Sequence, residues 1–184
     1  MTRDQAVSNS LVAIHDRGDG LYNQVLVIIN GVVNFDEVAG YCTQVVGAGS
    51  GGSDTFLNLA QYQKDSIEYN EARLSGRDSE VACLQDAWDW LTTGLTGTPH
   101  SVAVVVVGNI GPCIPCQRRI KAFRDAIVHR FGADVQVEVE VIYDQDDASA
   151  WDTERSNIPT TYGYRDLPDS SLSDGTPVWR YQVT

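Results

Sequence analysis

Residues 101–143 read SVAVVVVGNIGPCIPCQRRIKAFRDAIVHRFGADVQVEVEVIY. The stretch from Ser101 to Val107 is apolar after its first residue and rich in valine, as in strands that are buried on both faces of a sheet. Residues 113–131 carry apolar side chains at helical spacing, and residues 135–143 alternate valine with polar residues. The stretch therefore predicts a strand, a helix and a second strand, and a right-handed crossover makes the two strands parallel neighbours.

Weaker patterns extend this unit toward the N-terminus. Apolar spacing predicts a helix over residues 3–16, and a run of valine and isoleucine predicts a strand over residues 24–30. Gly31 is expected to turn the chain into a second strand that starts at Val32 and extends over residues 41–46.

Two further helices are expected before residue 101. One starts at Asp54, a good helix cap, and runs to about Arg73. The other covers Ser79 to Leu91 and has Glu80 in its first turn. In the tail we expect a short helix around Trp151 and a last strand over residues 178–183.

Together these elements predict an α/β protein with a three-layer α/β/α fold. Its central mixed sheet is expected to have about five strands, with residues 101–107 as the central one. A chain of 184 residues suits one domain, 1–184, with a core over about residues 20–145 and a tail over 146–184.

The composition excludes insertion into a membrane. Mean hydropathy is −0.21, and the apolar run of residues 102–107 is far too short to cross a bilayer. The first six residues lack the apolar stretch of a secretory signal peptide, so the expected location is cytoplasmic.

The formal charge is −12, with 25 acidic and 13 basic residues, and would repel nucleic acid over most of the surface. Five basic residues nevertheless follow the second cysteine of the Cys-x-x-Cys pair within thirteen positions: Arg118, Arg119, Lys121, Arg124 and Arg130. This cluster is either a solvated helix face or a contact for a polyanion.

Two of the four cysteines, Cys113 and Cys116, form a Cys-x-x-Cys pair at the start of a predicted helix. The helix dipole and the exposed amides there favour thiolates, which bind metals. Four cysteines are too few for a disulfide scaffold, and Cys42 and Cys83 are expected to be core thiols.

A zinc hydrolase needs three protein ligands and an open position for water. The sequence Asp78-Ser79-Glu80 lies at the start of the preceding helix, and Glu80 comes 33 residues before Cys113. Two helix N-termini that face each other would build such a site. The histidines, His15, His100 and His129, are expected at the surface or in hydrogen bonds.

Asp78-Ser79-Glu80 followed by Pro112-Cys113-Ile114-Pro115-Cys116 resembles the cytidine deaminase-like superfamily, over roughly residues 20–145. That family has His/Cys-x-Glu on one helix and Pro-Cys-x-x-Cys on the next. The segment from Gly111 to Gln117, followed by Phe123 and a valine-rich strand, is most similar to deaminase domains of bacterial polymorphic toxins. The departure is Asp78, which stands where the family usually has histidine or cysteine, although a carboxylate can also bind zinc.

The resemblance implies a zinc-dependent hydrolase that deaminates cytosine to uracil, most similar to the toxin enzymes that act on single-stranded DNA. Asp78, Cys113 and Cys116 would bind Zn²⁺, which activates the attacking water, and Glu80 would move the protons. It also implies delivery into a rival cell as part of a larger secreted toxin, with a cognate immunity protein as partner.

Substrate contacts are expected near the carboxyl ends of the central strands and in the tail, because a flipped base needs aromatic and polar neighbours. Ile142-Tyr143-Asp144 resembles the segment that contacts the base 5′ to the target in polynucleotide cytosine deaminases. Tyr143 could equally be a core residue, and Trp151 could equally pack the last strand against the sheet. The candidate substrate-binding residues are Asn109, Arg118, Tyr143, Asp144 and Trp151.

Other functions remain open from the residues alone. Strand, Cys-Ile-Pro-Cys, helix and Ile158-Pro159-Thr160 also resemble a thioredoxin-like disulfide oxidoreductase that would use Cys113 and Cys116. The remaining alternatives are a deaminase of free cytidine and a zinc-stabilised domain that binds a partner without catalysis. Metal content would discriminate the zinc proteins from the oxidoreductase.

Overall fold

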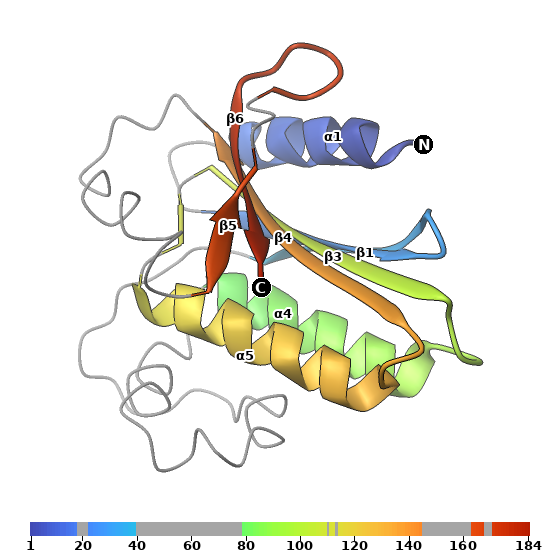
Figure 1. Ribbon diagram of the computed structural model, residues 1–184. Coiled ribbons are helices and arrows are strands. Elements are labelled where there is room, and N and C mark those ends of the chain that lie inside the picture. The colour runs from blue at the N-terminus through green and yellow to red at the C-terminus, as the bar shows by residue number, and fades with distance from the viewer. Residues whose placement is uncertain (18–21, 40–78, 110, 113, 145–162, 168–170) are drawn as a thin grey trace.

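The computed structural model describes residues 1–17, 22–39, 79–109, 111–112, 114–144, 163–167 and 171–184. These residues form an α/β structure with three α-helices and one six-stranded mixed sheet (Figure 1). The elements in chain order are α1 (Arg3–His15), β1 (Asn23–Ile29), β2 (Val32–Ala39), α4 (Ser79–Asp89), the π-helical turn η2 (Trp90–Gly94), β3 (Ser101–Gly108), α5 (Ile114–Phe131), β4 (Gln136–Asp144), β5 (Tyr164–Asp166) and β6 (Val178–Val183).

The strand order in the sheet is β2-β1-β3-β4-β6-β5. β3 and β4 are parallel, with Ser101 opposite Gln136 and Gly108 opposite Tyr143, and every other pair is antiparallel. The predicted parallel unit and its interior strand are thus confirmed. The sheet has six strands rather than about five, because β5, only three residues long, was not predicted.

The hairpin between β1 and β2 turns on Asn30 and Gly31, whose φ angles are 51° and 80°. A two-residue turn with both φ angles positive favours Asn-Gly, because these residues tolerate the left-handed region best. Asn30 Oδ1 also accepts hydrogen bonds from the backbone N–H groups of His100 (2.9 Å) and Ser101 (3.1 Å). The turn therefore fixes the start of β3 as well.

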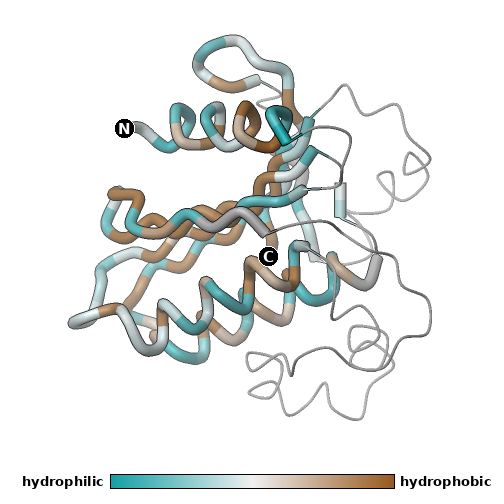
Figure 2. Tube along the Cα trace, turned by 180° about the vertical axis from the view of Figure 1, so that it is seen from behind, coloured by the Kyte–Doolittle hydropathy of each residue, from teal (hydrophilic) through white to brown (hydrophobic). Residues whose placement is uncertain are grey.

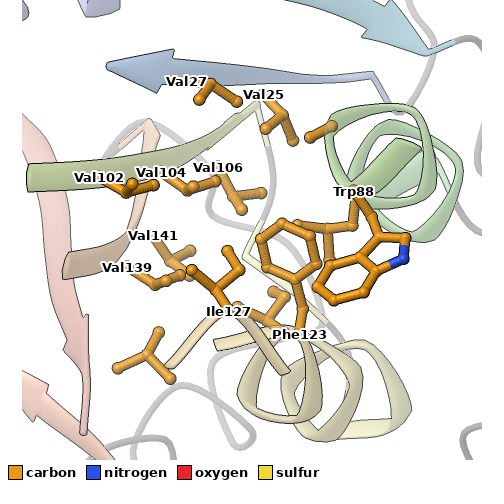
Figure 3. Close-up of a cluster of buried hydrophobic side chains, with 14 of the residues drawn as sticks. Val25, Val27, Trp88, Val102, Val104, Val106, Phe123, Ile127, Val139 and Val141 are labelled. Carbon is orange, nitrogen blue, oxygen red and sulfur yellow. The ribbon is translucent and has the colours of Figure 1, made fainter. Parts of the chain in front are cut away.

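Helices cover both faces of the sheet, α1 one face and α4 with α5 the other (Figure 1). Alternate residues of β1 divide between the two layers: Val25 and Val27 face α4 and α5, whereas Leu26 and Ile28 face α1. Figure 2 shows the apolar strands between the helices. Trp88 of α4 meets Phe123 of α5 edge to face, with ring centroids 6.5 Å apart (Figure 3).

The alternating strand β4 turns its polar side chains toward α1, and this buries one of them. Glu140 is 3% exposed and accepts a hydrogen bond from Arg180 Nε at 2.8 Å. Arg3 of α1 pairs with its other oxygen. Burial lowers the pKa of Arg3, and the nearby Arg180 adds to this effect.

The helix expected over residues 79–91 begins at Ser79, but its α-helical part ends at Asp89 and continues as the π-helical turn η2. The elements expected over residues 41–46, 54–73 and around Trp151 lie outside the described residues. In the described part of the chain, no helix is both long and apolar enough to span a bilayer.

Candidate functional site

The N-termini of α4 and α5 lie at the same edge of the sheet, where the parallel strands β3 and β4 end (Figure 1). The chain leaves β3 and enters α5, and it leaves α4 and enters β3, so both helices run antiparallel to β3. The carboxyl edge of parallel strands is where α/β proteins commonly bind ligands. The arrangement therefore brings the first turns of both helices to a favourable edge.

Glu80 lies in the first turn of α4 and is 5% exposed. The Ser79 hydroxyl donates to Glu80 Oε2 over 3.5 Å, and Asn23 Nδ2 donates to Ser79 Oγ at 2.7 Å. Because Asn23 of β1 lies opposite Gly108, the last residue of β3, these bonds fix the start of α4 to the carboxyl edge.

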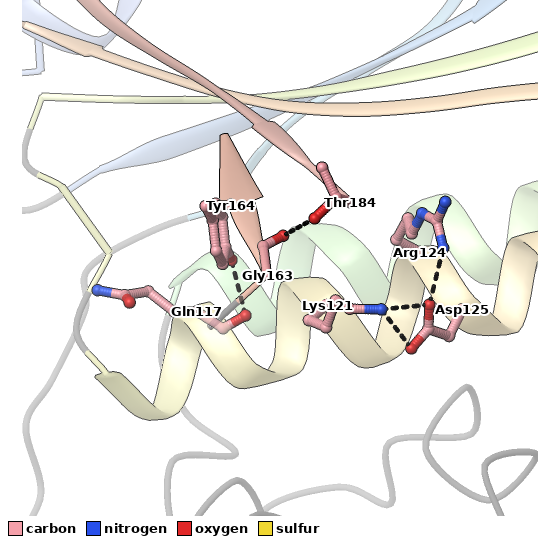
Figure 4. Close-up of polar contacts among 7 residues, drawn as sticks. All are labelled: Gln117, Lys121, Arg124, Asp125, Gly163, Tyr164 and Thr184. Atoms are coloured by element: carbon pink, nitrogen blue, oxygen red, sulfur yellow. Dashed lines mark hydrogen bonds and ion pairs between the residues drawn. The ribbon is translucent and has the colours of Figure 1, made fainter. Parts of the chain in front are cut away.

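Cys116 lies in the first turn of α5 and is completely buried. The next residue, Gln117, holds the preceding loop, because its Nε2 donates to the Pro112 carbonyl at 2.8 Å. Tyr164 of β5 donates its hydroxyl to the Gln117 carbonyl at 2.7 Å (Figure 4). The start of α5 is thus tied both to the loop after β3 and to the C-terminal part of the sheet.

The loop after β3 also rests on Tyr143. A Cβ added to Gly111 would lie 3.0 Å from Tyr143 Cζ. Tyr143 is fully buried and stacks on Tyr181, with ring centroids 5.9 Å apart. In this structure Tyr143 supports the loop from inside the core.

Three other expected substrate contacts, Asn109, Arg118 and Asp144, lie near the same edge in the described part of the chain. Asn109 Oδ1 accepts from the Tyr22 N–H at 3.0 Å, which joins the end of β3 to the start of β1. Asp144, at the end of β4, pairs with His15 Nε2 at 2.8 Å and is 16% exposed. Arg118 is half-buried in the first turns of α5.

The basic cluster on α5 is smaller than the sequence indicates. Arg119 is fully buried, so it does not belong to a surface cluster. Lys121 and Arg124 both pair with Asp125, at 2.6 and 3.0 Å, which offsets part of their charge (Figure 4).

Three of the expected site residues, Asp78, Cys113 and Trp151, lie outside the described residues. Within the described ranges, no three His, Cys, Asp or Glu side chains are grouped as metal ligands would be. The described members of the expected centre are Glu80 and Cys116, each in the first turn of a helix at the carboxyl edge.

Sequence reasoning missed Asn23 and Gln117, which hold the two helix starts in place. The signal for Asn23 was weak: it is a polar residue directly before an apolar strand. Gln117 directly follows the cysteine motif, where a buried amide side chain can hold the loop.

The chain matches no protein-family model, and no curated protein is significantly similar to it.

Proposed function

We propose that the protein is a zinc-dependent hydrolytic deaminase with a cytidine deaminase-like fold, which converts cytosine to uracil in single-stranded DNA. The observation that carries this proposal is the pairing of two helix starts at the carboxyl edge of β3 and β4. One presents a buried carboxylate, Glu80, and the other a buried thiol, Cys116. An acid–base group beside a thiol ligand is what a zinc deaminase requires.

The donor set suits zinc. Cys116 offers sulfur at a helix N-terminus, where the dipole stabilises a thiolate, and zinc binds thiolates well. Cys113 and Asp78 would complete three protein ligands. When bound, the ion would supply Lewis acidity that brings the pKa of water toward neutrality.

Glu80 would carry the protons of the reaction. Its carboxylate accepts a proton from the water that adds to C4 of cytosine, and donates a proton to the ring nitrogen. The proton of the new C4 hydroxyl then passes through Glu80 to the amino group, which leaves as ammonia while the C4 carbonyl forms, and uracil remains. Burial of Glu80 keeps competing bulk water away from these transfers.

A single-stranded polynucleotide suits the proposed reaction better than a duplex, because the target base must leave its stack. The chain as a whole carries −12 charges, so phosphates need a local basic contact. Arg118 at the start of α5 offers one beside the proposed centre. The remaining proposed contacts are Asn109, Asp144 and Trp151, whereas the buried Tyr143 would act only by supporting the loop. In a bacterial toxin, such an activity would be neutralised in the producer by an immunity protein.

The proposal is tested by zinc content and by uracil formation. Purified protein should hold one zinc ion per chain, and Cys116→Ala should lose it, whereas Cys83→Ala, a matched buried cysteine, should keep it. A metal-free protein that reduces disulfides would overturn the proposal and favour the oxidoreductase.

The substrate is tested by incubation of the zinc protein with single-stranded DNA, duplex DNA, RNA and free cytidine. Uracil should form fastest in the single-stranded DNA. Turnover of free cytidine alone would contradict the polynucleotide substrate, and a zinc protein inactive on all four would indicate a non-catalytic domain.

A further inference from the structure

We propose that Asn23 and Ser79 are positioning residues that hold the Glu80 carboxylate for proton transfer. This inference rests on the proposed deaminase function. It assigns a role to Ser79, the middle residue of Asp78-Ser79-Glu80, and to Asn23, which lies outside that motif. It is carried by a chain of hydrogen bonds that runs from the sheet to the carboxylate.

The donors and acceptors in this series of hydrogen bonds follow from the chemistry of the groups. Asn23 Nδ2 is only a donor, so the Ser79 oxygen, 2.7 Å away, must accept. A hydroxyl has a single proton, and that of Ser79 remains available for Glu80 Oε2, at 3.5 Å. Asn23 thus orients the Ser79 hydroxyl toward the carboxylate.

Asn23 itself is held rigidly. It is the first residue of β1 and pairs with Ala39 of β2 on one side and with Gly108 of β3 on the other. Its carbonyl accepts a hydrogen bond from Cys83 Sγ at 3.4 Å, one turn beyond Glu80 in α4. Two turns of α4 are therefore attached to one residue of the sheet.

The three side chains are shielded from solvent. Asn23, Ser79 and Glu80 are 5%, 2% and 5% exposed. In such an environment hydrogen bonds are stronger than in water, and water does not readily replace a lost partner. Removal of the Ser79 hydroxyl should therefore leave the carboxylate less well held.

The terminal torsion of a glutamate is broad, so each hydrogen bond to the carboxylate narrows the range of orientations that it samples. A bond from Ser79 to Oε2 restricts this rotation, and catalytic geometry tolerates little misplacement. The bond is long, so it orients Oε2 while leaving the carboxylate able to exchange protons. The expected consequence is a higher kcat with little effect on KM.

The test compares two substitutions of nearly the same shape. Ser79→Thr keeps the hydroxyl and Ser79→Val removes it, so any difference between them reports the hydrogen bond. In the zinc protein we expect kcat of Ser79→Val to be about 10- to 100-fold below that of Ser79→Thr, with similar KM. Ser10→Ala, which removes a buried serine hydroxyl from α1, should leave kcat unchanged.

A second readout needs no metal. In the metal-free protein, the effects of Asn23→Ala and Ser79→Ala on unfolding should be non-additive, because the two side chains share a hydrogen bond. Additive effects, or equal kcat for Ser79→Thr and Ser79→Val in an active protein, would overturn the positioning role alone. A zinc-loaded wild-type protein without turnover would instead overturn the proposed function, and the positioning role with it.

Discussion

Glu140 carries its charge inside the protein, where it is 3% exposed between Arg3 and Arg180. A buried ion pair gives little net stability against apolar residues, but loss of one partner leaves the other charge uncompensated. We therefore expect Glu140→Gln to lower the free energy of unfolding by about 3 kcal/mol, measured by urea denaturation.

Glu138 is the matched control for this prediction. It lies on the same strand, is 38% exposed at its side chain and approaches Arg3 at only 3.7 Å. Glu138→Gln should cost less than about 1 kcal/mol, as for exposed ion pairs. Equal losses of unfolding free energy in the two variants would show that burial does not determine how much Glu140 contributes to stability.

Gly111 is the residue at which the loop before Cys113 touches the core. A Cβ there would meet Cζ, Cε2 and Cε1 of Tyr143 at 3.0, 3.2 and 3.3 Å, so the ring or the loop must shift, and the ring is fully buried and stacked on Tyr181. Gly111→Ala should displace the loop, weaken zinc binding at least tenfold and cost about 1–3 kcal/mol of stability. Zinc affinity is measured by competition with a chelator.

Gly94→Ala provides the control for that crowding. Its Cβ would lie 3.1 Å from Cδ1 of Trp90, but this ring is half-buried at the opposite end of α4. Zinc affinity should therefore remain as in the wild type. If both variants weakened zinc binding equally, the effect would be a general loss of packing rather than a displaced loop.

The helix α1 is held on the sheet by an apolar face and by polar contacts to the C-terminal part of the chain. Its Ser8 hydroxyl donates to Asp174, and its Asp4 accepts from the Ser173 N–H at 3.2 Å. The Ser8 hydrogen bond is the main reason why the pKa of Asp174 falls from 3.8 to about 2.

This shift predicts an acid-sensitive contribution to stability. A carboxyl whose pKa is lower in the folded state stabilises the fold above its unfolded pKa, and the contribution disappears as pH falls from about 4 to about 2. Ser8→Ala and Asp174→Asn should each flatten the decline of stability over that range, followed by urea denaturation at several pH values. Ser10→Ala should lower stability by a similar amount at every pH, and an unchanged acid slope in the first two variants would refute the assignment.

Elements with strong local patterns could be predicted from the sequence. β3 is a continuous apolar run and β6 begins and ends at the expected residues, because burial on a sheet selects β-branched and aromatic side chains over several positions. The strand β5 has three residues, too few for a pattern. The π-helical turn η2 arises from local geometry after Asp89, for which the sequence carries no periodic signal.

The candidate site was predictable only in part for a similar reason. Glu80 and Cys116 belong to short motifs, which can be recognised from the sequence because their residues are close together along the chain. Asn23 contacts Ser79 across 56 positions of sequence, and only the folded sheet brings them together. The burial of Arg119 likewise depends on tertiary packing, which a count of basic residues does not contain.

The C-terminal strands β5 and β6 are part of the central sheet. β6 lies between β4 and β5. The described residues of this segment bury apolar or aromatic side chains on both faces of the sheet: Tyr164, Leu172, Val178, Tyr181 and Val183. At roughly 1.5–3 kcal/mol each, they contribute about as much as the entire stability of a typical domain.

Removal of residues 163–184 should therefore abolish cooperative unfolding, as followed by circular dichroism during heating. Removal of Thr184 alone is the control, because it loses only its two hydrogen bonds to the Gly163 carbonyl, at 2.7 and 2.9 Å. That shorter truncation should still unfold cooperatively, with a loss of about 1–2 kcal/mol. A cooperative transition without residues 163–184 would mean that the other strands form a self-sufficient core.

If this edge of the sheet is a deaminase site, uracil should form in a single-stranded oligonucleotide that contains one cytosine. The zinc-loaded protein should convert the cytosine, and Glu80→Gln should bind zinc equally well while losing at least 100-fold in rate. Wild-type protein that holds zinc but forms no uracil, or a Glu80→Gln variant as active as the wild type, would contradict the account.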